Sequence, residues 1–487
     1  MGTNTSRNNR NADIISQAIG TSFLEKHQKY RSVYGTNELY YGIGVENELY
    51  LEFDVRQELT KTKFLKNRAK ERYSVDYNSS YDKEKLEKVL NDYANYYFLN
   101  NDVMKLPILL NSHSFEHGDS LGNQRTTYTK SPQPNPIFSG KTLAETMFET
   151  NDYLKSNYDK LYTFDGDTIE FITLNFYSAT VKQVIEELRQ HKAEFLDNIN
   201  KVFDQCDIFK QYGKVCIMKQ NYPFAVHLTN LNNYGMFNNG TIHVNITLPT
   251  FLDSNGNIKD KFAFVHNHRN YAKYIQFVEP LLIAMYGSAD VFSENSELFS
   301  KGSQRCSVSR YIGVGSFDTD KMRTGKILVE RTDTMEFANN DFWWYNKFHD
   351  NSAYKKLDQI GMDINFNKHY NHGLEIRIFD HMEEDKLEKI LEFLIYLADF
   401  ILDRKNENIV DSACNPIYDE KWNCFVEKVI RFGNLACVDV GTLDMYNSIF
   451  KTHLKCVSVK ELYDNIFKML QSQYSQKGKF SKLALNK

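Results

Sequence analysis

Apolar and polar residues alternate with a period of two in four segments of the chain, at residues 42–53, 167–174, 241–248 and 372–380. This period is typical of a β-strand with one buried face, because successive side chains point to opposite faces of a sheet. The clearest apolar faces consist of Ile43, Val45, Leu49, Leu51 and Phe53 in the first segment, Ile242, Val244, Ile246 and Leu248 in the third, and Leu374, Ile376 and Ile378 in the fourth.

The opposite faces of these strands carry many charged or polar residues. These are Glu46, Glu48 and Glu52 in the first strand, Glu170 in the second, His243 and Asn245 in the third, and Glu375 and Arg377 in the fourth. If the strands belong to one sheet, its open face gathers several carboxylates, an imidazole and a guanidinium. The pattern therefore predicts a site for a cation together with a phosphate group.

Metal and phosphate chemistry explains why such residues would share a face. Neighbouring carboxylates repel each other unless cations lie between them, and oxygen-rich sites suit Mg²⁺ or Mn²⁺. His243 would supply a nitrogen ligand or a hydrogen bond to phosphate, while Arg377 would hold a phosphoryl group beside a metal bound by Glu375. For any one strand alone, a solvated polar face is the alternative explanation, so the site depends on the four strands meeting in space.

Helical periodicity is clearest at residues 179–203, where the apolar stripe consists of Val181, Val184, Ile185, Leu188, Phe195, Ile199 and Val202. A second long helix is predicted at 270–286 and ends at Gly287. Further helices are predicted at 12–30, 82–98, 384–403, 416–430 and 459–474. The region 300–380 is predicted to be rich in strands.

The remaining segments suggest an α+β fold with a helical C-terminal part. Residues 113–140 are rich in Pro, Gly, Ser and Asn and predict a long loop that covers a site. The basic tail after Tyr474 is predicted to be mobile. The pattern contains no internal repeat and no linker, and we divide it into an N-terminal arm and helix at 1–35, a main domain at 36–410 and a helical segment at 411–487 packed on that domain. The role of the insertions at 60–150 and the oligomeric state stay open.

Composition is that of an ordinary globular protein. The 487 residues are 41% hydrophobic and 25% charged. The net charge of -4 does not favour binding to polyanions such as nucleic acid or anionic lipid. The polar N-terminus lacks the apolar core of a signal peptide, and no apolar run is long enough to span a bilayer. We therefore expect a cytoplasmic protein with no membrane and no nucleic-acid partner. Gly2 with Ser6 fits a loose myristoylation pattern that arises often by chance.

Other motifs indicate little chemistry. The seven cysteines are odd in number and form no CxxC pair, so we expect reduced thiols and neither a disulfide framework nor a structural zinc site. His266 and His268 precede the predicted helix at 270–286 and fit a capping or surface pair better than ligands, and His227 fits a structural role. The glycines of residues 42–44 lack the third glycine of a dinucleotide fold, and no P-loop motif exists, so ATP would be held by metals and side chains. The aromatic residues 342–345 fit core packing better than base stacking.

The four strands and their order resemble the glutamate–cysteine ligase family, within the glutamine synthetase-like superfamily of carboxylate–amine ligases. The resemblance covers residues 42–380 and follows five motifs in order. They are a Gly-x-Glu-x-Glu strand (Gly44, Glu46, Glu48), IEFIT around Glu170, GTIHVNITLP with His243 and Asn245, SQRCS with Ser303, Arg305 and Ser307, and a Glu-x-Arg strand (Glu375, Arg377). The long stretches between the motifs carry no likeness.

The resemblance implies a curved antiparallel sheet that forms the active-site face, with helices on its outer side. It implies that Glu46, Glu48, Glu170, Glu375 and His243 ligate Mg²⁺. It also implies a catalytic role for Glu48, Arg305 and Arg377, and contacts to ATP from His243, Asn245 and both arginines. The family has a further acidic residue shortly before the IEFIT motif, and Asp165 or Asp167 would serve there with altered spacing.

The activity that the resemblance implies is ATP-dependent ligation of the glutamate side-chain carboxylate to an amine through an acyl phosphate. Cysteine is the amine that the family suggests, with ATP and Mg²⁺ as cofactors and small amino acids as partners. One alternative is an amidoligase for another amino acid or a peptide. A second alternative is an inactive homologue that kept the sheet for nucleotide binding or structure.

Overall fold

The computed structural model describes residues 39–54, 107–110, 125–126, 133–134, 142–165, 168–175, 177–205, 213–219, 240–251, 259–289, 301–304, 374–403 and 420–485. The helices predicted at 12–30 and 82–98 lie outside the described residues, as does most of the region 300–373. Most of the predicted loop 113–140 lies outside them too, although it includes a two-stranded ladder of β3 (Arg125–Thr126) and β4 (Gln133–Pro134).

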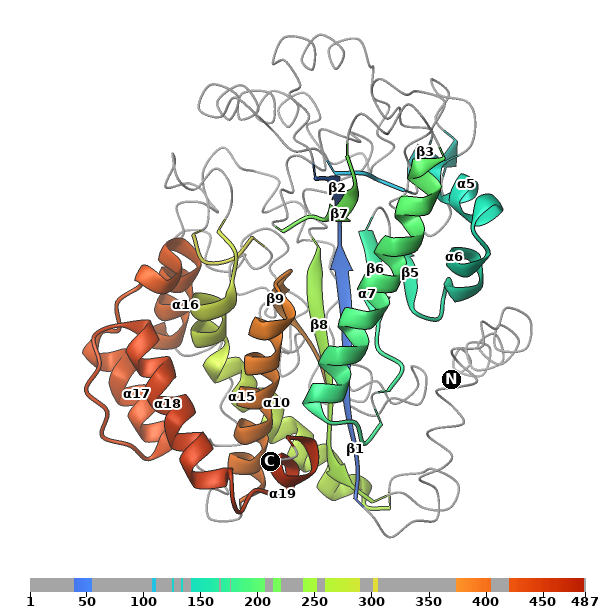
Figure 1. Ribbon diagram of the computed structural model, residues 1–487. Coiled ribbons are helices and arrows are strands. Elements are labelled where there is room, and N and C mark those ends of the chain that lie inside the picture. The colour runs from blue at the N-terminus through green and yellow to red at the C-terminus, as the bar shows by residue number, and fades with distance from the viewer. Residues whose placement is uncertain are drawn as a thin grey trace, which may run out of the picture.

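A five-stranded antiparallel sheet contains all four of the predicted strands. Its order is β5-β6-β1-β8-β9, with the two long strands β1 and β8 next to each other (Figure 1). The strand bounds are β1 at Tyr40–Leu49, β5 at Tyr162–Asp165, β6 at Thr168–Ile172, β8 at Thr241–Thr250 and β9 at Leu374–Asp380. Every pairing in this sheet is antiparallel. The α+β class and the antiparallel sheet are thereby confirmed.

The first predicted strand is divided in the structure. It ends in the main sheet at Leu49, and β2 (Leu51–Phe53) pairs with β7 (Val215–Ile217) in a separate two-stranded sheet. Tyr50, between the two strands, accepts a backbone hydrogen bond from Met218 at 2.9 Å. The expectation that Glu52 shares a face with Glu46 was therefore wrong, because Glu52 lies in the second sheet, opposite Cys216.

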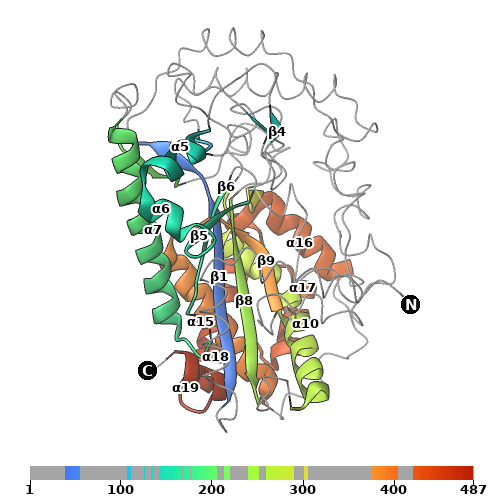
Figure 2. The same ribbon diagram turned by 90° about the vertical axis from the view of Figure 1, so that its right-hand side faces the viewer.

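Helices cover the apolar face of the main sheet. Helix α7 (Val181–Asp204) contacts β1 and β6, while α10 (Lys261–Tyr286) contacts β8 and β9. Helix α15 (Glu384–Leu402) packs against both helices, and Figure 2 shows α7 and α15 on one side of the sheet. The apolar residues of β1, β8 and β9 join these helices in one hydrophobic cluster. Burial of this apolar surface is the main favourable contribution to the stability of the fold.

Capping residues explain where the long helices begin. Thr180 accepts from the backbone N–H of Gln183 at 3.2 Å, and the Gln183 side chain accepts from the backbone N–H of Thr180 at 2.8 Å, which forms a capping box at the start of α7. Helix α10 begins nine residues before the predicted bound, because Asp260 caps it by accepting from the N–H of Ala263 at 2.9 Å. Two shorter helices, α5 (Leu143–Thr150) and α6 (Asp152–Asn157), precede β5.

The C-terminal region consists of helices that pack on α10 and α15. They are α16 (Glu420–Phe432), the 3₁₀ turn η6 (Gly433–Leu435), α17 (Val440–Phe450), α18 (Val459–Tyr474) and α19 (Lys479–Ala484). The expectation of a mobile tail after Tyr474 was wrong. The backbone N–H groups of Phe480 and Ser481 each donate to the Asp399 carboxylate at 2.8 Å, and the buried Phe480 ring fixes α19 against the rest of the core.

Candidate metal centre

Strand register brings the predicted residues to one face of the sheet. Glu46 in β1 lies opposite His243 in β8, and Asn245 in β8 lies opposite Glu375 in β9. Residues directly opposite each other in an antiparallel pair point to the same face. The three adjacent strands β1, β8 and β9 therefore each contribute side chains to a shared polar surface.

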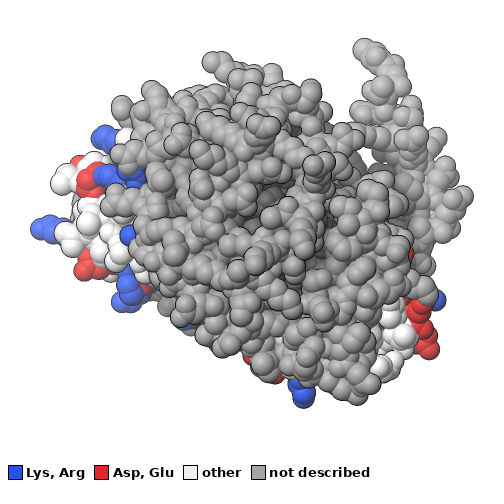
Figure 3. All heavy atoms as spheres, turned by 90° about the horizontal axis from the view of Figure 1, so that it is seen from above, with Lys and Arg blue, Asp and Glu red and all other residues white. Residues whose placement is uncertain are grey.

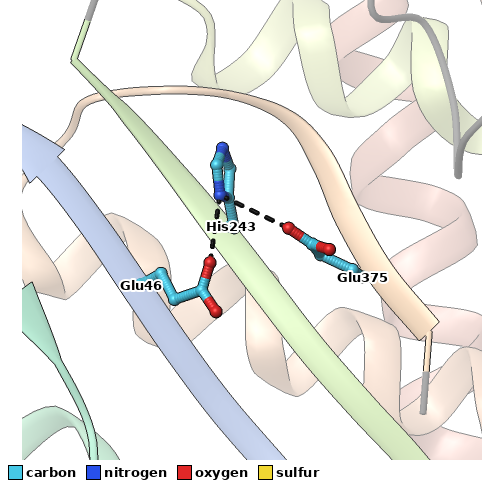
Figure 4. A group of neighbouring side chains, drawn as sticks. All are labelled: Glu46, His243 and Glu375. Atoms are coloured by element: carbon cyan, nitrogen blue, oxygen red, sulfur yellow. Dashed lines mark hydrogen bonds and ion pairs between the residues drawn. The ribbon is translucent and has the colours of Figure 1, made fainter. Parts of the chain in front are cut away.

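Glu46, His243 and Glu375 form the centre of this surface (Figure 4). The imidazole Nδ1 of His243 lies 3.3 Å from Oε2 of Glu46 and 3.5 Å from Oε1 of Glu375. One ligand atom from each of the three residues lies within 4.8 Å of the others. His243 is buried, and the side chains of Glu46 and Glu375 are only 18% and 14% exposed. Two carboxylates and one imidazole in such proximity match the oxygen and nitrogen ligands of a divalent cation.

The hydrogen bonds of Thr241 determine which nitrogen of His243 carries a proton. The single hydroxyl hydrogen of Thr241 is donated to Oε2 of Glu48 at 3.0 Å, so this hydroxyl accepts from Nε2 of His243 at 3.0 Å. In the neutral imidazole the lone pair of Nδ1 then faces the carboxylates of Glu46 and Glu375. A lone pair directed at two anionic oxygens is repulsive unless a cation or a second proton lies between them. A metal ion held by Nδ1 and both carboxylates would remove this repulsion, as would a proton on Nδ1 donated to Glu46 across the 3.3 Å contact.

A second pair of carboxylates lies beside this group. Glu48 in β1 is opposite Glu170 in β6, and the Glu48 side chain is buried. Like charges directly opposite each other in a sheet are destabilising unless positive charge compensates them. Oε1 of Glu48 lies 3.7 Å from Nε2 of His243, which joins the pair to the central group.

Arg377 supplies a positive charge at the edge of the same surface. Its guanidinium forms an ion pair with the Glu375 carboxylate, and 33% of the side chain is exposed. A partly exposed guanidinium next to a candidate metal ligand is suited to contact an anionic ligand, because its planar set of donors matches phosphate oxygens. The structure thus brings Glu46, Glu48, Glu170, His243, Asn245, Glu375 and Arg377 to one surface.

Three other predicted residues are placed in part or not at all. Arg305 and Asp167 lie outside the described residues. Asp165 ends β5, where it is the register partner of Thr168. Backbone hydrogen bonds anchor the segment that precedes Arg305: Gly302 donates to Ile430 at 3.0 Å, and Gln304 donates to Ser288 at 2.9 Å.

Thr241 is a site residue that the sequence interpretation missed. Its hydroxyl contacts both Glu48 and His243, although it was not singled out as a candidate. The signal was present, because Thr241 lies two residues before His243 and so shares its face in a strand. Its small size and lack of charge made it inconspicuous.

The remaining histidine predictions have mixed outcomes. His266 and His268 lie inside α10 and not before it. His268 is buried, with Nε2 accepting from the backbone N–H of Leu248 at 3.0 Å and Nδ1 donating to the carbonyl of Phe264 at 2.8 Å, which is a structural role. His227 lies outside the described residues.

Cys216, Cys424, Cys437 and Cys456 are free thiols.

Two further features of the described residues are the character of the helices and the distribution of surface charge. Within this part of the chain, no helix combines the length and the apolar character that a membrane crossing requires. Figure 3 views the molecule from above and shows basic and acidic side chains close together on the described surface at its left margin.

Comparison with known proteins finds a similar protein from a virus. No family model matches the chain, and no solved structure matches it. The chain is 39% identical over 475 residues to the protein named Uncharacterized protein R704 of Acanthamoeba polyphaga mimivirus, and the match covers 97% of this chain and 81% of the relative. Identity of this extent covers the sheet and the helices that flank it. The chain therefore belongs to the family of the mimivirus protein R704.

Proposed function

We propose that the protein is an ATP-dependent and Mg²⁺-dependent carboxylate–amine ligase. It would join the side-chain carboxylate of glutamate to the amine of a second amino acid, with cysteine as the first candidate. The observation that supports this most directly is the position of Nδ1 of His243 between the carboxylates of Glu46 and Glu375. That arrangement suits a metal-bound phosphate site better than a solvated strand face.

The proposed roles follow from position on the sheet. Glu46, His243 and Glu375 would hold one Mg²⁺ ion, and Glu48 with Glu170 would hold a second. The metal would neutralise triphosphate charge and thereby make the γ-phosphoryl group easier to transfer. Arg377, at the exposed edge, would orient the transferred phosphoryl group, and Asn245, opposite Glu375, would contact the nucleotide. Arg305 would share the role of Arg377, as the motif around it suggests.

The reaction would proceed in two steps. A carboxylate oxygen of glutamate attacks the γ-phosphorus, which forms an acyl phosphate and releases ADP. The amine then attacks the acyl carbon, loses a proton and expels inorganic phosphate. A charged, partly buried site favours the phosphoryl transfer, because a preorganised set of charges stabilises the transferring group at little reorganisation cost.

An inactive homologue is the alternative from another class. The number of charged groups on the surface opposes it, because buried charges without a ligand are costly to keep. An amidoligase for another amino acid or a peptide would use the same sheet with a different acceptor. Product identity distinguishes all three possibilities.

The test measures ADP release with ATP and Mg²⁺ across a panel of single amino acids and amino-acid pairs, with mass spectrometry of the products. We expect ADP only when glutamate and a second amine are both present, together with an amide product. Glu170→Ala should abolish this turnover and leave the fold intact, since Glu170 lies on a solvent-facing position of β6 that is only partly buried. An unchanged rate in Glu170→Ala would refute the site, and protein that binds ATP without releasing ADP on any substrate would support the inactive homologue.

A further inference from the structure

Asn47 lies on the opposite side of the sheet from the metal centre. It is the residue between Glu46 and Glu48 in β1, and strand alternation turns its side chain towards the helices. The side chain is fully buried. Burying an amide there is unfavourable unless it is hydrogen-bonded, so its bonds require explanation.

The Asn47 amide joins three segments of the sheet. Its Nδ2 lies 3.3 Å from the carbonyl oxygen of Glu48, 3.2 Å from that of Thr241 and 3.1 Å from Nδ1 of His381. Glu48 belongs to β1, Thr241 begins β8, and His381 directly follows the last residue of β9. These are the same three strands that carry Glu46, His243 and Glu375.

The chemistry of the acceptors fixes the orientation of this amide. Carbonyl oxygens only accept, so the nitrogen of Asn47 and not its oxygen must face Glu48 and Thr241. His381 must then accept through an unprotonated Nδ1, so the two amide hydrogens of Asn47 are shared among three acceptors, while its Oδ1 has no hydrogen-bond partner among the described residues. Burial, and after it the charge of Lys192, lowers the pKa of His381 to about 3, so the ring is neutral and can accept.

Thr241 transmits the contact to the metal face. Its carbonyl accepts from Asn47 on the helix side, while its hydroxyl contacts Glu48 and His243 on the other side. The β8–β9 register shifts between Ile242 and Val244, so ladder hydrogen bonds alone do not align these strands evenly at this point. The Asn47 amide supplies a connection where the ladder is irregular.

We propose that Asn47 is a positioning residue for the metal centre. Its amide sets the spacing of β1, β8 and the end of β9, and therefore the separation of Glu46, His243 and Glu375. Groups that orient metal ligands typically change metal affinity by about 10-fold to 100-fold when they are lost. This inference rests on the metal site of the proposed function but needs neither ATP nor an amino-acid substrate.

The experiment measures Mn²⁺ affinity by electron paramagnetic resonance of the full-length protein, with no nucleotide present. Asn47→Leu keeps a side chain of similar size and removes the donors, and we expect at least about a 10-fold weaker affinity with an altered spectrum of the bound ion. Asn447→Leu is the matched control. Asn447 in α17 donates to the carbonyl of Leu454 at 3.1 Å and accepts from its N–H at 2.7 Å, so its loss costs comparable hydrogen bonds far from the sheet face.

The outcomes separate the inference from the proposed function. Wild-type affinity in folded Asn47→Leu would overturn the positioning role and leave the metal site standing. Absence of Mn²⁺ binding in the wild-type protein would overturn both. His381→Phe keeps an aromatic ring and removes the Nδ1 acceptor together with Nε2, so it provides the test if Asn47→Leu does not fold. A smaller loss of affinity is expected, and unchanged affinity would contradict the role of the amide.

Discussion

Carboxylates are accommodated in different ways on the sheet face and in the helical layer. On the sheet, Glu46 and Glu375 converge on one nitrogen of His243. In α10, Glu279 is completely buried, and neither of its oxygens has a hydrogen-bond partner within the described part of the chain. Burial raises the pKa of Glu279 well above its ordinary value of 4.5, so the side chain is a neutral acid.

Asp399 in α15 shows a third arrangement. It is buried and accepts two backbone N–H groups at the start of α19, although burial still raises its pKa. The comparison teaches that burial alone does not define a functional carboxylate. A lone carboxylate takes up a proton or accepts backbone donors, and among the described residues only the sheet face directs several ligand atoms at one point.

The largest expected effect is the loss of metal binding in His243→Ala. Removing a direct ligand should weaken Mn²⁺ affinity by more than about 100-fold, beyond the usual effect of an outer partner. Calorimetric titration with Mn²⁺ measures this. His266→Ala is the control, since His266 is exposed and lies in α10. Equal Mn²⁺ affinities in His243→Ala and His266→Ala would show that the histidine on the sheet face contributes no more to metal binding than the exposed histidine of α10.

Glu279→Gln should change the pH dependence of stability. Above about pH 4.5 the unfolded state ionises Glu279 while the folded state keeps it neutral, so the stability of the wild type falls as pH rises towards the raised folded pKa. Relative to Glu279→Gln, the wild-type free energy of unfolding should fall by about 1.4 kcal/mol per pH unit in that range. Urea unfolding between pH 4 and pH 8 checks this, and parallel curves for the two proteins would be inconsistent with a neutral Glu279.

Asp399→Asn should destabilise the protein by about 1–3 kcal/mol, because the amide nitrogen cannot accept from the N–H groups of α19 and one buried donor loses its partner. Hydrogen exchange should increase at Phe480 and Ser481 first. Asp464→Asn, which alters an exposed carboxylate paired with Lys460, is the matched control. Protection of α19 that is the same in both variants would show that Asp399 does not hold this helix.

The smallest effect is expected at the exposed ion pair itself. Lys460 and Asp464 are four residues apart on α18, and their side chains are 64% and 38% exposed. Lys460→Ala should change the free energy of unfolding by less than about 0.5 kcal/mol, because water screens such pairs. A loss of several kcal/mol in urea unfolding would mean that surface charge has a larger role than this comparison allows.

Period-two patterns predicted the strand faces well. Glu46, His243 and Glu375 were placed on polar faces from alternation alone, and register then brought them together. The sequence did not reveal that Tyr50 interrupts the first strand, because Leu49 and Leu51 continue the same alternation. The strand is divided there because β2 pairs with β7, which is distant in the sequence. The local alternation of apolar and polar residues carries no information about such a pairing.

The helix at residues 179–203 was predicted from its apolar stripe alone, and in the structure Thr180 caps it as α7. The early start of α10 was missed, since the polar residues 266–270 obscure the stripe. Asn47 was missed for a related reason. A polar residue at a core position looks like an irregularity in the pattern, and its partners Thr241 and His381 are distant in sequence.

The proposed ligase is tested most directly by following oxygen from substrate to phosphate. The wild-type protein is incubated with ATP, Mg²⁺, an amine such as cysteine, and glutamate carrying ¹⁸O in both oxygens of its side-chain carboxylate. If the carboxylate is activated as an acyl phosphate, each molecule of amide product should be accompanied by inorganic phosphate that contains one ¹⁸O atom. Amide product with unlabelled phosphate, or phosphate release without any amide product, would contradict the account.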